Sequence, residues 1–116
     1  TEGAIIGWFQ GRMEVGARAL GNRSILANPA FPDMKDKINR EVKHREKFRP
    51  FAPAMMAEHA HKYFSIRPDQ QYEPFHTWML QAAQVLPEME SQIPAVVHAD
   101  KSIRPQVVSP KSNERF

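Results

Sequence analysis

Ten prolines are spread over the 116 residues of this chain, and they limit the length of any helix or strand. Proline lacks a backbone N–H and disfavours a helical conformation in the residue before it. One stretch has a clear helical pattern: residues 33–43 follow Pro32 and repeat apolar side chains at Met34, Ile38 and Val42. This spacing predicts a helix whose apolar stripe faces a core.

The remaining apolar runs are short, rich in β-formers and bounded by glycine or proline, which predicts strands. We expect strands over residues 4–10, 24–28, 51–58, 77–85, 93–99 and 102–108, a helical turn over 60–64 and a polar loop over 67–74. The first strand is expected to be buried. Several strands with few helices predict a single α/β domain, 1–116, of mixed α+β character with an open or incomplete sheet.

The chain contains no cysteine, which excludes disulfides, thiol nucleophiles and cysteine metal sites and fits a reducing compartment. It has no charged and apolar leader and no apolar run near ~18 residues, so we expect a cytoplasmic protein that does not enter a membrane.

The chain begins Thr1-Glu2-Gly3 and ends just after a strand-like stretch. We therefore expect a fragment of a longer protein.

Positive charge is concentrated in the first half of the chain, although the formal net charge is only +3. Residues 1–50 hold ten Lys/Arg against six Asp/Glu, whereas residues 51–116 hold six against seven. A basic surface raises the local concentration of anions, whatever their identity. Nucleotide, nucleic acid and an acidic surface all remain open on charge alone.

Most of this charge lies in two short blocks. The first block, residues 11–24, places Arg12, Arg18 and Arg23 among glycines, and the second block, residues 43–53, contains Lys43, Arg45, Lys47 and Arg49 before a Pro-Phe-Ala-Pro segment. Glycine lets backbone N–H groups approach an anion closely, and guanidinium forks bind phosphate or carboxylate oxygens two at a time. A nucleotide or an acyl phosphate is therefore the first ligand class to consider.

Simpler interpretations stand beside the phosphate hypothesis. The first block has neither a Gly-Lys-Ser/Thr ending nor Gly-x-Gly-x-x-Gly spacing, which excludes a Walker loop and a dinucleotide fingerprint. Its arginines are equally compatible with a solvated loop or with pairing to Glu14. In the second block, the dipole at a helix end explains Lys43 and Arg45 without a ligand. It does not explain Arg49, which stands between phenylalanine and proline in a rigid apolar context.

Histidine and aromatic residues give weaker indications. His59 and His61 form a pair without a carboxylate at metal-ligand spacing, so we expect no metal site in this chain. His98 follows an expected strand and is either a satisfied surface histidine or a residue that faces a ligand. The aromatic residues sit mainly in apolar runs, which favours core positions over base-stacking platforms and argues against RNA binding. These residues are Trp8, Phe9, Phe48, Phe51, Phe64, Phe75 and Trp78.

The first block also supports a family assignment. Residues 11–25 read Gly-Arg-Met-Glu-Val-Gly-Ala-Arg-Ala-Leu-Gly-Asn-Arg-Ser-Ile. They closely resemble the Gly-Arg-x-Glu-x-Gly-x-Arg-Ala-Leu-Gly-x-Arg-Ser signature of the carbamoyltransferase family, which includes NodU-type nodulation proteins and antibiotic O-carbamoyltransferases. The resemblance continues through residues 34–39, 43–53 and 93–100, with Arg104 and Gln106. Alanine stands at position 17 where many relatives have proline, and the chain ends before an Asn-Thr-Ser-Phe-Asn stretch of the family pattern.

The resemblance implies that the chain is part of the C-terminal, YrdC-like domain of a two-domain enzyme. That domain is expected to form a carbamoyl adenylate from carbamoyl phosphate and ATP, with ATP entering as its Mg²⁺ complex. The carbamoyl group would then pass to a hydroxyl acceptor in an N-terminal domain of actin-like ATPase fold that holds a metal. The implied partners are ATP, carbamoyl phosphate and this N-terminal domain, with neither membrane nor nucleic acid.

The resemblance also implies roles for individual residues. Arg18, Lys43 and Arg49 match family positions expected to hold phosphates or the acyl phosphate, and these are the expected catalytic residues. Arg12, Arg23 and Arg45 are expected to complete the nucleotide-binding set. Fixed cations would offset the charge that develops during phosphoryl and adenylyl transfer. The alternative is a non-catalytic nucleotide- or RNA-binding module that uses a basic concave face.

Overall fold

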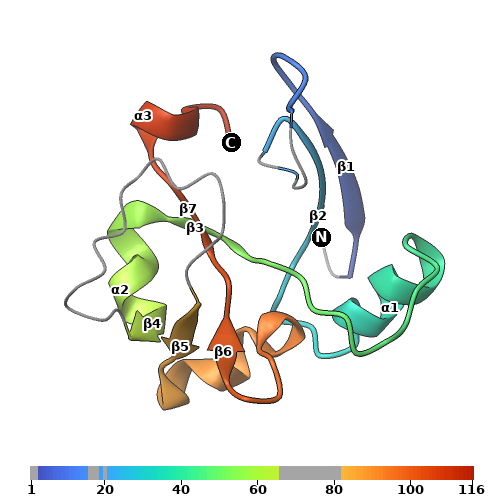
Figure 1. Ribbon diagram of the computed structural model, residues 1–116, viewed down its shortest axis with the longest axis vertical. Helices are drawn as coiled ribbons and strands as arrows, with labels where there is room; N and C mark the ends of the chain where they lie inside the picture. The colour runs from blue at the N-terminus through green and yellow to red at the C-terminus, as the bar shows by residue number, and fades with distance from the viewer. Residues whose placement is uncertain (1–2, 16–18, 20, 66–81) are drawn as a thin grey trace.

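The strands of the computed structural model are short and lie in three small sheets (Figure 1). The structure describes residues 3–15, 19, 21–65 and 82–116. The strands are β1 (Ile5–Phe9), β2 (Arg23–Ala27), β3 (Ala54–Met56), β4 (Phe64–Ser65), β5 (Ala83–Val85), β6 (Ser102–Ile103) and β7 (Gln106–Val108). The α-helices are α1 (Met34–Glu41), α2 (Ala60–Tyr63) and α3 (Pro110–Asn113), and 3₁₀ turns are η1 (Ala57–His59), η2 (Pro87–Gln92) and η3 (Pro94–Val96). This is the predicted mixed α/β class.

Strands β1 and β2 form an antiparallel pair that runs from Ile5 opposite Ala27 to Phe9 opposite Arg23. The predicted strands at both places are confirmed, but the prediction that β1 is buried is wrong. Phe9 is 78% exposed and Ile6 is 47% exposed. The physical reason is that this two-stranded sheet packs only in part: Ile5 and Ala27 contact the core around α1, while the far end of the pair extends into solvent.

Helix α1 begins where the sequence predicted, and its Met34 and Ile38 side chains are 3% and 6% exposed. The prediction that Val42 continues this buried stripe is wrong, because Val42 is 36% exposed and caps the helix. The N–H groups of Val42 and Lys43 both donate to the carbonyl of Ile38, so the helix ends in that turn. His44 then takes a left-handed φ of 47°, which directs the chain away from the helix axis.

The larger core lies on the other side of the molecule in Figure 1, around α2, β4 and β5. The predicted helical turn at 60–64 is confirmed as α2, and the following Phe64 is 2% exposed. Strand β5 lies between β4 and β6, antiparallel to both. The predicted strand 77–85 ends in β5, while its first residues and the predicted loop 67–74 lie outside the described residues.

The structure differs from the prediction at three further places, and proline accounts for the first two. The predicted strand 93–99 is wrong: its first half forms the 3₁₀ turn η3, where Pro94 offers no N–H to a sheet while Ala95 and Val96 are still buried. The predicted strand 102–108 is interrupted by Pro105 into β6 and β7, which belong to different sheets. The predicted strand 51–58 contracts to β3, which pairs parallel to β7.

A tight turn joins η3 to β6. The Ser102 hydroxyl and backbone N–H both donate to Asp100 Oδ1, at 2.6 and 3.0 Å, and Ser102 Oγ lies 3.2 Å from His98 Nδ1. The hydrogen bonds from the Ser102 side chain and backbone hold the pKa of Asp100 below its usual value, and the charge of His98 acts in the same direction. The structure thus places His98 in a structural turn.

No helix in the described part of the chain combines the length and the apolar character needed to span a bilayer.

Replacing Asp100 with asparagine should lower the melting temperature at pH 7. The folded-state pKa of Asp100 lies below the unfolded value of about 3.9, so its stabilisation is fully present above pH 4 and is lost as the pH falls through the lower folded value. Thermal unfolding followed by circular dichroism should show a deficit at pH 7 that shrinks at pH 3. Glu114→Gln, at an exposed position, is the control. An equal deficit at both pH values would contradict this role.

Candidate functional site

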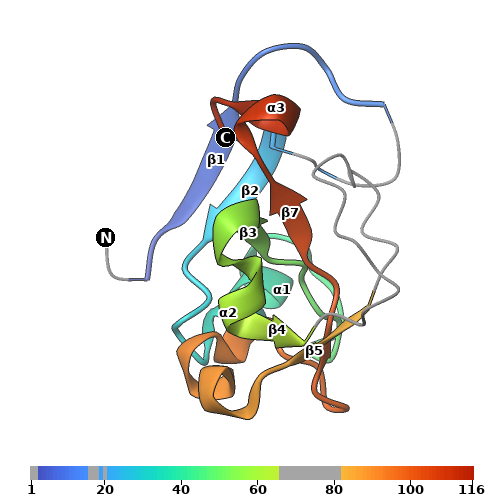
Figure 2. The same cartoon turned by 90° about the vertical axis from the view of Figure 1, so that its left-hand side faces the viewer.

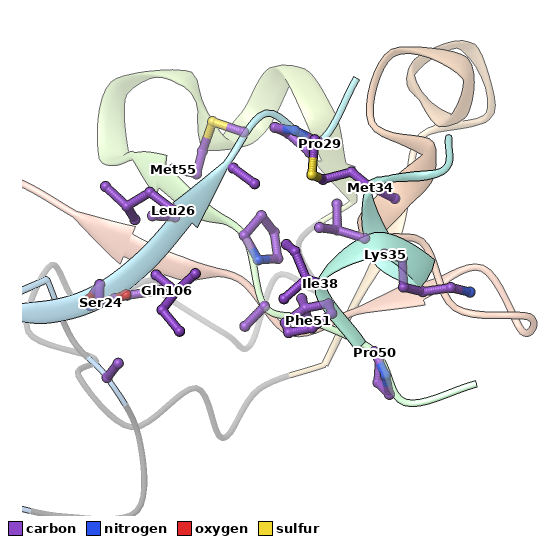
Figure 3. A pocket seen from close by; sticks show the side chains of 18 of the residues that line it. Ser24, Leu26, Pro29, Met34, Lys35, Ile38, Pro50, Phe51, Met55 and Gln106 are labelled. Carbon is purple, nitrogen blue, oxygen red and sulfur yellow. The ribbon is translucent and has the colours of Figure 1, made fainter. Parts of the chain in front are cut away.

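A pocket of about 720 Å³ opens between β2, α1, the second block and the β3–β7 pair. Its walls are largely apolar, and Figure 3 shows Leu26 and Met55 facing Ile38 and Phe51 across it. The pocket brings together residues far apart in the sequence, because the parallel pairing of β3 with β7 places Gln106 beside the end of the second block. Concave, mainly apolar sites with a few polar groups are typical ligand-binding pockets.

The charged residues of this pocket are all cations. Lys35, Lys43, Arg45 and Arg49 line it, and its described walls contain no aspartate or glutamate. Three of the six predicted phosphate-binding residues therefore share one pocket. Lys35 was not predicted, and in Figure 3 its side chain extends from α1 away from Leu26 and Met55.

Asn39 connects helix α1 to the second block. It lies in the last part of the helix and is fully buried, at 0% exposure. Its side-chain amide donates to the carbonyls of Lys47 and Arg49, at 3.3 and 2.9 Å, and its Oδ1 accepts from Arg45 Nε at 2.7 Å. The backbone N–H of Arg45 also donates to the carbonyl of Asn39 at 3.0 Å. One buried side chain thus ties helix α1 to the loop that carries Arg45 and Arg49.

Arg45 is the most constrained of these cations. Its guanidinium carbon lies 4.7 Å from the centre of the Phe51 ring, close enough for a cation–π contact. Burial lowers the pKa of Arg45 from its usual value, the nearby charge of Arg49 lowers it further, and Glu46 acts in the opposite direction. The guanidinium still carries its charge at neutral pH, but its environment disfavours that charge.

Lys43 and Arg49 lie at the rim of the pocket. Both residues are exposed, and neither side chain makes an ion pair or hydrogen bond with any residue that the structure describes. The backbone N–H of Arg49 donates to the carbonyl of Glu46 at 3.2 Å, which closes a short turn before Pro50. The second block therefore presents two exposed cations beside the guanidinium of Arg45, which Asn39 and Phe51 contact.

Arg12 and Arg23, the two predicted first-block residues that the structure describes, do not line this pocket. Arg23 begins β2, donates to the carbonyls of Gln10, Gly11 and Asn22, and stacks over the Phe9 ring at 3.4 Å. These contacts hold the two strands together at their open end. Arg23 does not line the pocket, and its predicted role in phosphate binding stays a prediction.

Arg12 is exposed and lies outside the pocket lining, and Arg18 lies outside the described residues. The carbonyl of Arg12 accepts a hydrogen bond from Asn22 Nδ2 at 3.2 Å. Glu14, which the sequence offered as an ion-pair partner for the arginines of this block, accepts a hydrogen bond from the backbone N–H of Asn22 at 2.9 Å. The described part of the first block is thus organised mainly around Asn22.

A cluster of amides ties the first block to the end of the chain. Gln10 Nε2 donates to Asn113 Oδ1 at 3.0 Å, and Asn113 Nδ2 donates to Asn22 Oδ1 at 3.3 Å. Figure 2 shows the resulting arrangement, with α3 beside the ends of β1 and β2. Phe116 lies against Gly21 and also lines the pocket. The C-terminal segment therefore links the first block to the pocket.

Two expectations about aromatic residues need correction. Phe9 and Phe48 were predicted to be core residues, but each is 78% exposed. The Arg23 guanidinium stacks on the ring of Phe9. Phe48 lies in the exposed loop of the second block. Phe64 is a core residue as predicted, while Phe75 and Trp78 lie outside the described residues.

No group of three or more potential metal ligands converges among the described residues. Of the predicted pair, His61 is exposed, and His59 lies 3.5 Å from the carboxylate of Glu58 and 3.4 Å from Lys62 Nζ. These neighbours place His59 on a charged surface turn.

The whole chain, residues 1–116, matches the family model described as Carbamoyltransferase C-terminus. The chain belongs to the carbamoyltransferase family. The resemblance seen in the first block is thereby confirmed.

The carbamoyltransferase relatives include several nodulation proteins. The chain is 45% identical to Nodulation protein NolNO of Sinorhizobium fredii over 119 residues, which cover 100% of the chain and 17% of that protein. It is 42% identical to Nodulation protein NolO of Bradyrhizobium diazoefficiens, covering 100% of the chain and 21% of that protein. Identity to Nodulation protein U of Rhizobium tropici is 48%, over 90% of the chain and 17% of that protein. The chain spans about a fifth of the length of these relatives.

Sequence reasoning missed Asn39 in this carbamoyltransferase segment. Asparagine is a poor residue for a helix interior, and this one directly follows Ile38 of the buried stripe. A polar residue next to the buried stripe of a helix could have indicated a buried side chain that makes hydrogen bonds. Its partners could not be found in the same way, because two of them are backbone carbonyls.

Gly21→Ala should lower the free energy of unfolding by about 1–3 kcal/mol, because position 21 requires an unusual backbone. Its φ is +103°, and an added Cβ would lie 2.6 Å from Phe116 Cγ. Gly7→Ala is the matched control, because a Cβ at that position meets nothing within 4 Å. Urea unfolding of both variants measures the difference. Equal stabilities would show that Phe116 does not pack against the first block.

Proposed function

We propose that this pocket binds the phosphate groups of ATP and carbamoyl phosphate, and that the full-length carbamoyltransferase uses it to form a carbamoyl adenylate. The supporting observation is a cluster of cations in one pocket whose described walls contain no carboxylate. Arg45 and Arg49 are close enough for one charge to disfavour the other. A bound polyanion would relieve that repulsion, and each charge-assisted hydrogen bond contributes about 1.5–3 kcal/mol.

The three side chains suit different parts of this task. The guanidinium groups of Arg45 and Arg49 can each hold two phosphate oxygens, whereas Lys43 supplies a point charge that can follow a moving oxygen. Fixed cations stabilise negative charge as it develops without having to reorganise first. Arg18 remains a predicted member of this set on the strength of the family signature.

The proposed reaction is a hydrolysis of carbamoyl phosphate, followed by an adenylyl transfer and then a carbamoyl transfer. Carbamoyl phosphate and water yield carbamate and phosphate. A carbamate oxygen then bonds to the α-phosphorus of ATP, and the bond to the β-phosphate breaks to release pyrophosphate. The acceptor hydroxyl next attacks the carbamoyl carbon, loses its proton and releases AMP. Negative charge moves onto a departing phosphate group in each step, so the pocket cations are placed to stabilise the leaving groups.

Magnesium enters this proposal only as part of the ATP substrate. The described pocket walls offer cations and no carboxylate, so the residues present do not form a divalent metal site. We place the hydroxyl acceptor and the metal of the complete enzyme in a separate N-terminal domain. This division rests on the family resemblance and agrees with the small share of the relatives that the chain covers.

Truncating Lys43, Arg45 or Arg49 to alanine in the full-length protein should weaken binding of carbamoyl phosphate or ATP about tenfold to a hundredfold, since each variant loses a charge-assisted partner. Lys47→Ala is the matched control: it removes the same charge from the same block, but the Lys47 side chain does not line the pocket. Isothermal calorimetry measures binding, and melting temperatures identify unfolded variants. The pocket assignment fails if all three variants bind like the wild type, or if Lys47→Ala loses as much.

A competition experiment separates the enzyme from the alternative of an RNA-binding module. With a fluorescent ATP analogue bound to the full-length protein, unlabelled ATP should displace it at far lower concentration than single-stranded RNA of matched charge. A nucleic-acid surface would show the reverse order and a steep loss of affinity with salt, because neutralising many phosphates releases many counterions.

A further inference from the structure

We propose that Asn39 is a positioning residue for phosphate binding: it aims the Arg45 guanidinium and holds the loop that carries Arg49. The inference rests on the proposed function and adds to it a residue that touches no ligand itself. Asn39 is fully buried in α1, yet its side-chain bonds all go to the second block.

The hydrogen bonds of Asn39 permit only one orientation of its amide. An asparagine side chain has two donor hydrogens and one acceptor oxygen. Arg45 Nε is always a donor, so it must meet Oδ1, and the carbonyls of Lys47 and Arg49 are always acceptors, so they must meet Nδ2. Both donors and the acceptor are used. No other side chain of this size supplies the same set, and the loop carbonyls cannot exchange places with the guanidinium.

These contacts leave one part of Arg45 available for a ligand. Nε is occupied by Asn39, and the face of the guanidinium lies over the Phe51 ring at 4.7 Å. The two Nη groups make no hydrogen bond to any described residue. The contacts with Asn39 and with the Phe51 ring set the plane of the guanidinium group. A phosphate would therefore meet a fork that has little side-chain freedom left to lose on binding.

The Asn39 bond to the Arg49 carbonyl extends the same control along the loop. It acts together with the left-handed backbone at His44, where φ is 47°, and with the Arg45 N–H bond to the Asn39 carbonyl. The chain is thus attached to α1 both before and after the turn at 46–49. Without Asn39, Arg45 and Arg49 would keep their charges but lose their common geometry.

The test compares Asn39→Ala with Ile103→Ala in the full-length protein, using inorganic pyrophosphate as the calorimetric probe. Ile103 is fully buried in the core around α2, β4 and β5 and does not line the pocket, so its truncation destabilises the fold while leaving every pocket side chain in the sequence. Asn39→Ala should weaken pyrophosphate binding tenfold or more, while Ile103→Ala, measured below its melting temperature, should bind like the wild type. If Asn39→Ala does not fold, Asn39→Ser, whose hydroxyl is too short to reach the three partners, is measured instead.

A double-variant cycle with Arg45→Ala tests whether Asn39 acts through the guanidinium. If it does, the combined variant should lose clearly less affinity than the product of the two single losses. Losses that multiply, or an asparagine variant that binds like Ile103→Ala, would overturn the inference while leaving the proposed function intact. Absence of pyrophosphate binding in the wild-type protein would instead remove the proposed function, and this inference with it.

Discussion

The buried amide of Asn39 is the constraint on which the arrangement of the pocket depends. Met34 and Ile38 anchor helix α1 in the core. Asn39, on the same helix, holds the loop of the second block through its hydrogen bonds to the carbonyls of Lys47 and Arg49. A polar group at 0% exposure is tolerable only when its hydrogen bonds are made, so the loop and the helix stabilise each other. The backbone that carries the cations of the second block is thereby attached to helix α1.

The first block follows the same physical logic with different residues. Asn22 and Asn113 connect the open end of the β1–β2 pair to the C-terminal segment, and Arg23 donates hydrogen bonds to the carbonyls of Gln10 and Gly11. The contacts of the Arg23 side chain therefore support the fold of this block. The arginines of the two blocks differ in their neighbours: Arg23 is surrounded by carbonyl acceptors, whereas Arg45 and Arg49, which we propose as phosphate ligands, lie close to one another.

The sequence predicted those features that depend on local pattern. Helix α1, the β1–β2 strands and the turn at α2 follow from apolar spacing and from glycine and proline boundaries, and the signature of the first block identified the family. Features that depend on distant contacts were missed. The apolar run from Ile93 fitted a strand as well as a buried turn, and Phe48 looked like a core residue until the path of the loop placed it outside. The pocket itself requires the β3–β7 pairing, which no local pattern shows.

The central claim is that the second block, held by Asn39, is where the phosphates bind. A crystal structure of the full-length protein with a non-hydrolysable ATP analogue and carbamoyl phosphate tests it most directly. Our account predicts phosphate oxygens about 2.7–2.9 Å from the Nη atoms of Arg45 and Arg49, with Asn39 still bonded to Arg45 Nε. Phosphates bound away from this pocket, with no contact to Lys43, Arg45 or Arg49, would contradict it.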